Sequence, residues 1–170
     1  LMWRPGFAHS QTHRARLLGY RRALCVRSFV HRGTPERPGL VLGLDRGGSC
    51  LGMAFLVPGA EAEATIAYLR ERELITHVYL EKRLPVRLDI GETVEAVTYV
   101  VDRDHRQYAG AVDIDEAARA VTGSVGQSGP NEEYVLNTIE HLRALGIRDR
   151  WLEGVGERIS AVPAAPHPAP

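Results

Sequence analysis

The chain has 170 residues, 44% of them hydrophobic, and its 21 basic residues balance its 21 acidic ones. These values predict one globular domain with a substantial core, and they exclude the net charge that nucleic acid or an anionic membrane surface would attract. There is no apolar run of about 18 residues that would predict a membrane span, and two distant cysteines outside any CxxC pattern are typical of a reducing compartment. We expect a cytoplasmic protein whose partner is a small molecule.

The first half of the chain is expected to form strands and one helix. Residues 14–28 have the β-branched and aliphatic composition of strands. Residues 40–44 and 50–56 flank the segment 45–49, whose paired glycines supply the positive φ that a hairpin turn needs. The sequence therefore predicts a hairpin there, followed by a helix over residues 61–73.

A second hairpin is predicted from residues 84–89 and 93–101, joined by a turn at Gly91. The alternating pattern of residues 93–101 indicates that one side of this strand faces a closed interior. Helices are predicted over residues 113–121 and 149–158, and a third from Pro130 to Leu145, ended by Gly146. Strands first and helices later predict an α+β domain with a mostly antiparallel sheet.

One carboxylate breaks the pattern of the helix over residues 61–73. The helical stripe through Ala62, Ile66 and Leu69 reaches Glu73 at the next turn. Burial raises the pKa of a carboxyl group toward the range that suits proton transfer. The sequence therefore makes Glu73 a candidate general base, with a surface ion pair to Arg70 as the alternative.

No sequence motif predicts a metal or a cofactor. The chain has neither a GxxxxGK[ST] phosphate loop nor a GxGxxG element. His9 and His13 are four residues apart, but no glutamate follows His9. The sequence therefore favours a solvated histidine pair over a zinc site. The segments 123–126 and 127–129 miss the GxSxG spacing of a serine hydrolase, and their glycines indicate a loop before the helix at Pro130.

Four segments follow the order and approximate spacing of one known family. They are Leu1-Met2-Trp3-Arg4-Pro5-Gly6-Phe7, His31-Arg32-Gly33-Thr34-Pro35-Glu36, Tyr68-Leu69-Arg70-Glu71-Arg72-Glu73 and Ser128-Gly129-Pro130-Asn131-Glu132-Glu133-Tyr134. Any one of them is a weak signal, whereas four in order are specific. Over roughly residues 1–150 the chain resembles the ChaC family of glutathione-specific gamma-glutamylcyclotransferases.

The resemblance implies a cofactor-independent cytoplasmic lyase that cleaves glutathione into 5-oxoproline and Cys-Gly. It implies a small α+β fold with a mostly antiparallel, partly closed β-barrel and flanking helices. In that family the glutamate of the Arg-Glu pair accepts a proton, and the matching residue is Glu73. The family's substrate loop, Gly-Tyr-Gly-Ser-Leu plus one residue, is matched only by Leu1 and Met2, which are the expected substrate-binding residues.

The resemblance also sets the expected extent of the domain. It is expected over residues 1–160, followed by a Pro/Ala-rich tail over residues 161–170. The chain starts at Leu1 rather than at a methionine, so we expect the domain to be truncated at its N-terminus. Most of the substrate loop would then be missing, and this piece is expected to be weakly active or inactive.

Several alternatives remain open from the sequence. Glu71 and Glu81 are alternative bases by residue type, and Arg72 and Tyr134 are weaker candidates for substrate contact. The same fold would also serve as a non-catalytic ligand-binding or regulatory module, or as a cyclotransferase for other gamma-glutamyl compounds. The sequence does not indicate an oligomeric state.

Overall fold

The computed structural model describes residues 5–161 of the chain. The described residues divide into two compact units, which we describe separately: residues 5–26 with 42–110, and residues 27–41 with 111–161. Within the described range, no helix combines the length and the apolar character that crossing a membrane requires.

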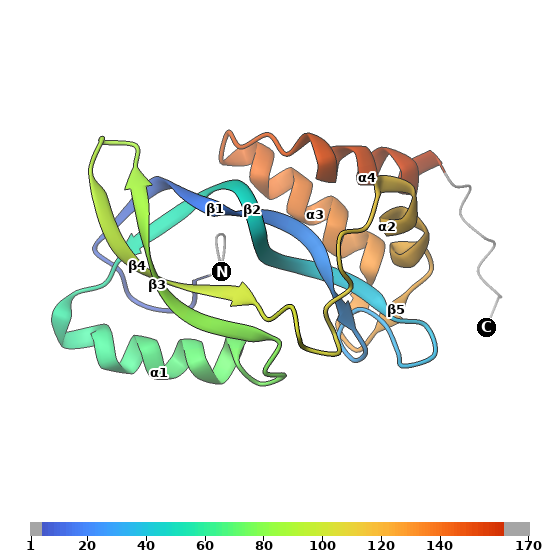
Figure 1. Ribbon diagram of the computed structural model, residues 1–170, viewed down its shortest axis with the longest axis horizontal. Coiled ribbons are helices and arrows are strands. Elements are labelled where there is room, and N and C mark those ends of the chain that lie inside the picture. The colour runs from blue at the N-terminus through green and yellow to red at the C-terminus, as the bar shows by residue number, and fades with distance from the viewer. Residues whose placement is uncertain (1–4, 162–170) are drawn as a thin grey trace. The chain divides into compact units, whose positions relative to one another are not determined.

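The first unit is built on a four-stranded sheet in the order β2-β1-β3-β4 (Figure 1). Its strands are β1 (Gln11–Ser28), β2 (Gly39–Leu56), β3 (Tyr79–Leu88) and β4 (Thr93–Val101). Strand β3 pairs antiparallel with both β1 and β4. The α+β class with a mostly antiparallel sheet is confirmed, while the closed part of the predicted barrel stays a prediction because the described strands follow an open order.

The predicted hairpin around Gly91 is confirmed. Gly91 has a φ of 91°, and its backbone N–H donates to the carbonyl of Leu88 to close the turn. The register pairs β3 and β4 residue by residue from Arg87 with Thr93 to Tyr79 with Val101. Strand β3 is longer than expected, because its pairing with β4 extends well before residue 84.

The predicted hairpin at residues 45–49 is wrong. Residues 39–56 form the single strand β2, which bends without reversing (Figure 1). Gly47 and Gly48 do adopt positive φ values of 103° and 67°. However, β1 lies beside the strand on both sides of these glycines: Arg21 contacts Asp45 at 2.9 Å, and Arg16 donates to Ser49 at 3.2 Å. The glycines therefore make a bulge within a paired strand.

Apolar side chains from β1 and β3 form a core cluster in this unit. Ala15 pairs with Leu88 and Leu17 with Val86 across the two strands, and all four are buried. The predicted helix follows β2: a short 3₁₀ turn, η1 (Gly59–Glu61), leads into α1 (Ala62–Glu73). The helix buries Thr65 and Leu69 against the unit.

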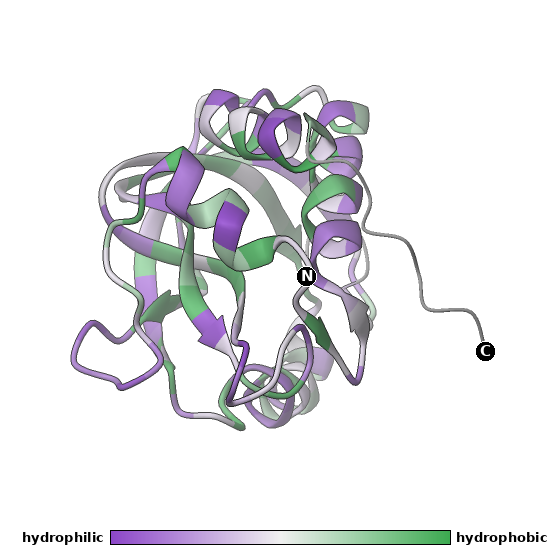
Figure 2. Cartoon of the chain, turned by 90° about the vertical axis from the view of Figure 1, so that its right-hand side faces the viewer, coloured by the Kyte–Doolittle hydropathy of each residue, from purple (hydrophilic) through white to green (hydrophobic). Residues whose placement is uncertain are grey.

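The second unit is mainly helical, as predicted. It contains α2 (Ile114–Val121), α3 (Asn131–Ala144) and α4 (Arg150–Ala161), and a minimal antiparallel pair, β5 (Val125–Gly126) with β6 (Gly129–Pro130). The side chain of Asp113 caps α2 by accepting from the N–H of Glu116 at 2.7 Å. The helices carry both hydrophobic and hydrophilic segments (Figure 2), as expected where one side of each helix is buried.

A buried asparagine, Asn131, links the first residue of α3 to the backbone of Leu40. The Asn131 side chain accepts from the N–H of Leu40 at 2.6 Å and donates to the carbonyl of Leu40 at 2.9 Å. Asn131 has no exposed surface. Its amide therefore satisfies both backbone groups of Leu40 in the way a neighbouring strand would.

We expect Asn131→Ala to lower the free energy of unfolding by about 2 to 4 kcal/mol, because it leaves a backbone donor and a backbone acceptor buried and unpaired. Urea denaturation followed by circular dichroism measures the change. Asn137→Ala on an exposed position of the same helix is the matched control. Equal stability of the two variants would contradict this role of Asn131.

Candidate active site

Glu73 is the last residue of α1, and its side chain is 21% exposed. The buried residues of the helix are Thr65 and Leu69, so a spacing of four leads from Thr65 through Leu69 to Glu73. Ala62 and Ile66 are half-buried and flank this line. Glu73 therefore follows the buried line of the helix but is itself half-buried, and the line runs through Thr65 rather than through Ile66.

The ion-pair partners of Arg70 and Arg72 differ from the predicted surface pair between Arg70 and Glu73. Arg72 approaches Glu73, with 3.3 Å between Nε and Oε1. Arg70 instead donates two hydrogen bonds to Glu81 of β3, at 2.8 Å and 2.7 Å. The ion pair proposed between Arg70 and Glu73 is therefore replaced by a bidentate pair with Glu81.

The two alternative bases have surroundings unlike those of Glu73. Glu71 is exposed to solvent. The pKa of Glu81 is lowered, first by its hydrogen bonds from Arg70. A carboxylate held ionised in this way is a poor proton acceptor. Glu71 is therefore solvated and Glu81 is held ionised by Arg70, whereas Glu73 lies at the end of the buried line of α1.

The Arg70–Glu81 pair gives unfolding a pH dependence. The pKa of Glu81 is below its ordinary value of 4.5 in the folded protein, so its contribution to stability is present above that value and is lost as the pH falls through the lowered pKa. We expect the difference in unfolding free energy between the unmodified protein and Glu81→Gln to narrow as the pH falls from about 7 to about 3. Urea denaturation at several pH values measures it, and a constant or widening difference would contradict the pairing.

Tyr99 joins this group and was not identified from the sequence. It lies on β4 directly opposite Glu81 in the register, is buried, and donates its hydroxyl to Glu81 at 3.3 Å. Burial raises the pKa of Tyr99 to about 12, with further contributions from Glu81 and Glu73. Tyr99 therefore keeps its proton at neutral pH and cannot itself serve as a base.

The first described residues lie against α1. Arg72 donates to the carbonyl of Pro5 at 3.3 Å and to the Tyr68 hydroxyl at 3.2 Å. Gly6 has a φ of 76°, and a Cβ there would collide with the Tyr68 hydroxyl. The backbone at Pro5 and Gly6 therefore contacts the turn of α1 that precedes Glu73.

Leu1 and Met2 lie outside the described residues. Their assignment as substrate-binding residues therefore stays a prediction.

In the second unit, two of the segments that carry the family resemblance come together. Arg32 donates to the carbonyl of Pro130 at 3.1 Å and lies over the Tyr134 ring, with 5.5 Å from Cζ to the ring centroid. The His31 ring and the Ser128 hydroxyl are 3.2 Å apart. These contacts join the loop at His31 and Arg32 to the segment where α3 begins, and Tyr134 is half-buried beneath the arginine.

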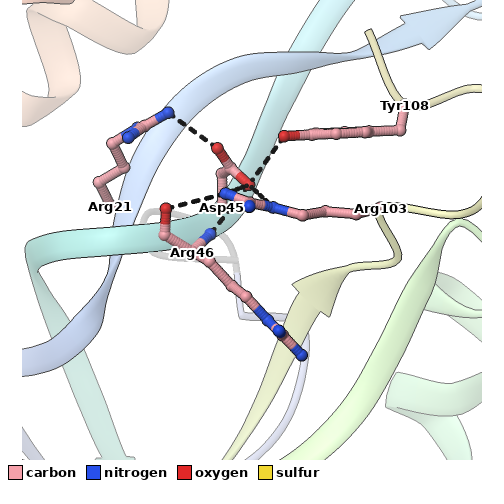
Figure 3. A network of polar contacts seen from close by, with 5 residues as sticks. All are labelled: Arg21, Asp45, Arg46, Arg103 and Tyr108. Carbon is pink, nitrogen blue, oxygen red and sulfur yellow. Dashed lines mark hydrogen bonds and ion pairs between the residues drawn. The ribbon is translucent and has the colours of Figure 1, made fainter. Parts of the chain in front are cut away.

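A second charged cluster in the first unit surrounds Asp45 (Figure 3). The Asp45 carboxylate is fully buried and lies 2.9 Å from Arg21 and 2.7 Å from Arg103. The Tyr108 hydroxyl and the N–H of Arg46 also donate to it, at 3.1 Å and 2.9 Å. A carboxylate satisfied by this many donors has a structural role rather than a catalytic one.

The two cysteines are free and buried. Burial raises the pKa of Cys25 to about 12, and the Asp45 charge contributes to the shift. A thiol that stays protonated at neutral pH is a poor nucleophile. Among residues 5–161, no three His, Cys, Asp or Glu side chains are grouped in a way that would hold a metal ion.

A cavity of about 280 Å³ lies beside the Asp45 cluster, and its lining includes Arg46, Lys82 and Arg103. Glu73 does not line it. Lys82 and Glu81 are neighbours on β3, so their side chains point to opposite faces of the strand. The candidate active site is therefore defined by Glu73 and its neighbours on α1, β3 and β4.

Comparison with known proteins finds relatives that are named as gamma-glutamylcyclotransferases. It is 32% identical over 152 residues to the glutathione-specific gamma-glutamylcyclotransferase of Escherichia coli (strain K12), covering 89% of this chain and 66% of that relative. It is 31% identical over 147 residues to glutathione-specific gamma-glutamylcyclotransferase 1 of Danio rerio, covering 84% of this chain and 75% of the relative. The chain thus spans about two thirds to three quarters of the length of these relatives.

The fold comparison agrees. The crystal structure of the yeast gamma-glutamyl cyclotransferase specific to glutathione superposes with a TM-score of 0.82 at 21% sequence identity, over 94% of each chain. The sequence model of the family described as ChaC-like protein matches residues 1–161. The chain therefore belongs to the ChaC-like protein family.

Proposed function

We propose that this protein is a gamma-glutamylcyclotransferase that converts glutathione into 5-oxoproline and Cys-Gly, with Glu73 as the general base. The observation that carries the proposal is the position of Glu73, which continues the buried line of Thr65 and Leu69. Its relatives in Escherichia coli and Danio rerio are named as glutathione-specific enzymes of this kind, which supports the choice of substrate.

The reaction begins with a proton transfer. An α-amine with a pKa of about 7.7 to 8.0 is largely protonated at neutral pH and cannot attack a carbonyl until a base removes a proton. Glu73 takes this proton. The freed amine nitrogen then attacks the γ-carbonyl carbon of the same molecule, forming the carbon–nitrogen bond of a five-membered ring.

The second half of the reaction breaks the original amide bond. As the tetrahedral carbon expels the nitrogen of Cys-Gly, the ring nitrogen gives up its second proton. The departing nitrogen receives this proton and the one held by Glu73, so that Cys-Gly leaves as an ammonium. No water is consumed and no net proton is gained or lost. Because both reacting groups belong to one substrate molecule, the main task of the protein is to hold one arrangement of the γ-glutamyl chain beside the base.

A substrate panel tests the proposal. The protein is incubated with glutathione and, separately, with gamma-glutamyl-alanine, and 5-oxoproline is measured by mass spectrometry. Faster release from glutathione supports a glutathione enzyme, whereas equal rates indicate a cyclotransferase for gamma-glutamyl compounds in general. Glutathione binding by calorimetry without any product, at enzyme concentrations high enough to detect a single turnover by a weakly active chain, would contradict the proposal and indicate a binding module.

A further inference from the structure

Arg70, Glu81 and Tyr99 form a polar network that joins α1 to the β3–β4 hairpin. Arg70 reaches Glu81 with both Nε and Nη2, at 2.8 Å and 2.7 Å, and the Tyr99 hydroxyl donates to the same carboxylate at 3.3 Å. Glu81 and Tyr99 face each other in the strand register. The Glu81 carboxylate therefore receives three hydrogen bonds from two different elements.

This network borders the candidate base. Arg70 precedes Glu73 by three residues on α1, so the two side chains share one face of the helix. Glu73 is also among the charges that raise the pKa of Tyr99. Arg72 on α1 approaches Glu73, and Tyr99 on β4 feels its charge. Arg70 on α1 and Glu81 on β3 are linked to this pair through the hydrogen bond from Tyr99.

The charges of the network determine how strong a proton acceptor Glu73 is. A cation beside a carboxylate favours its ionised form and makes it a weaker proton acceptor. Arg72 already approaches Glu73 at 3.3 Å. A second unpaired guanidinium on the same helical face would weaken the base further. Glu81 prevents this because its carboxylate holds Arg70 in a bidentate pair and balances its charge.

We propose that Glu81 is a positioning residue for the reaction: it holds Arg70 and Tyr99 in place, keeps the Arg70 cation away from Glu73, and so preserves Glu73 as a proton acceptor. This inference rests on the proposed function, because it assigns Glu81 a task in the same site. It also explains why a glutamate so near the site is not the base itself.

The test compares three variants on one background. In Glu81→Gln, the Arg70 cation loses its partner, so we expect kcat at pH 7 to fall about tenfold and the acid limb of the pH–kcat profile to move about one unit lower, with KM changed less than about twofold. In the double variant Arg70→Gln with Glu81→Gln, the cation is removed as well. Both kcat and the acid limb are then expected to return to within about twofold and about 0.3 units of the unmodified protein.

The matched control is Glu95→Gln. It makes the same charge change on the same hairpin, at an exposed pair with Arg83 whose closest atoms are 3.9 Å apart. We expect it to leave the pH–kcat profile unchanged. A double variant as impaired as Glu81→Gln would overturn the inference, because a merely structural role is not restored by removing the second partner. An unchanged profile in Glu81→Gln would overturn it as well.

A second readout separates this inference from the proposed function. The Glu73 carboxyl carbon is followed by ¹³C NMR during a pH titration and assigned by its loss in Glu73→Gln. We expect the titration midpoint to move lower in Glu81→Gln and to return in the double variant. This measurement needs no turnover, so an unchanged midpoint refutes the network even in an active enzyme. Absence of 5-oxoproline from the unmodified protein, at enzyme concentrations high enough to detect a single turnover, would instead refute the proposed function.

Discussion

Glu73→Gln is expected to lower the turnover of glutathione by about 10²- to 10⁴-fold, the range that follows from losing a general base. Glutamine nearly matches glutamate in size and keeps the hydrogen-bonding shape, so the fold at the end of α1 should be unaffected. What it lacks is the ability to accept a proton at neutral pH. The release of 5-oxoproline under saturating glutathione measures the loss directly.

Glu71→Gln is the matched control for this prediction. It makes the same chemical change two residues earlier on the same helix, at an exposed position. We expect turnover within about twofold of the unmodified protein, since exposed substitutions away from the site have small effects. Similar losses in both variants would mean that the charge of the helix end, rather than Glu73 as a base, supports the reaction.

The second large effect is expected at Asp45. Asp45→Ala should lower the free energy of unfolding by about 2 to 4 kcal/mol, because it removes the acceptor that satisfies Arg21, Arg103 and Tyr108 (Figure 3). The loss falls short of the largest seen for broken buried pairs because the side chains of Arg21 and Arg103 are 44% and 42% exposed. Water can therefore rehydrate both cations.

Asp104→Ala is the control for Asp45→Ala. It removes a carboxylate next to Arg103, from an exposed residue whose backbone N–H donates to Asp102. We expect its stability to stay within about 0.5 kcal/mol of the unmodified protein in urea denaturation. If Asp45→Ala proved equally mild, the cluster would not contribute to folding in the way its geometry indicates.

The parts of the fold that were predictable are those encoded by short-range patterns. The turn at Gly91 lies between two strands whose side chains alternate, and the Asp113 cap precedes an apolar helical face. Each signal lies within a few residues of the element that it specifies. Such signals can be read without knowing which segments meet in space.

The hairpin at residues 45–49 shows where this approach fails. A positive φ at Gly47 and Gly48 is compatible with a turn and also with a bulge, and the local sequence is the same for both. What decides between them is the partner strand. β1 is 18 residues long and lies beside β2 on both sides of the glycines, so the chain continues instead of reversing.

In the candidate site too, the residue set by local spacing was identified from the sequence, and those set by contacts between distant segments were missed. Glu73 was identified by helical periodicity, which depends only on spacing within α1. Tyr99 was missed because it is brought beside Glu81 by strand register across 18 positions of sequence. Its signal was a tyrosine on the alternating apolar strand β4, where a buried hydroxyl needs a polar partner. Asp45 was missed because it was placed in a hairpin turn.

The central claim is that the γ-glutamyl amine of glutathione attacks its own carbonyl. The most direct measurement is to incubate the protein with glutathione in H₂¹⁸O, at enzyme concentrations high enough to detect a single turnover, and to analyse the products by mass spectrometry. We predict 5-oxoproline without ¹⁸O, formed in an amount equal to Cys-Gly and lost in Glu73→Gln. Glutamate carrying ¹⁸O would show hydrolysis instead of cyclisation and would contradict the account.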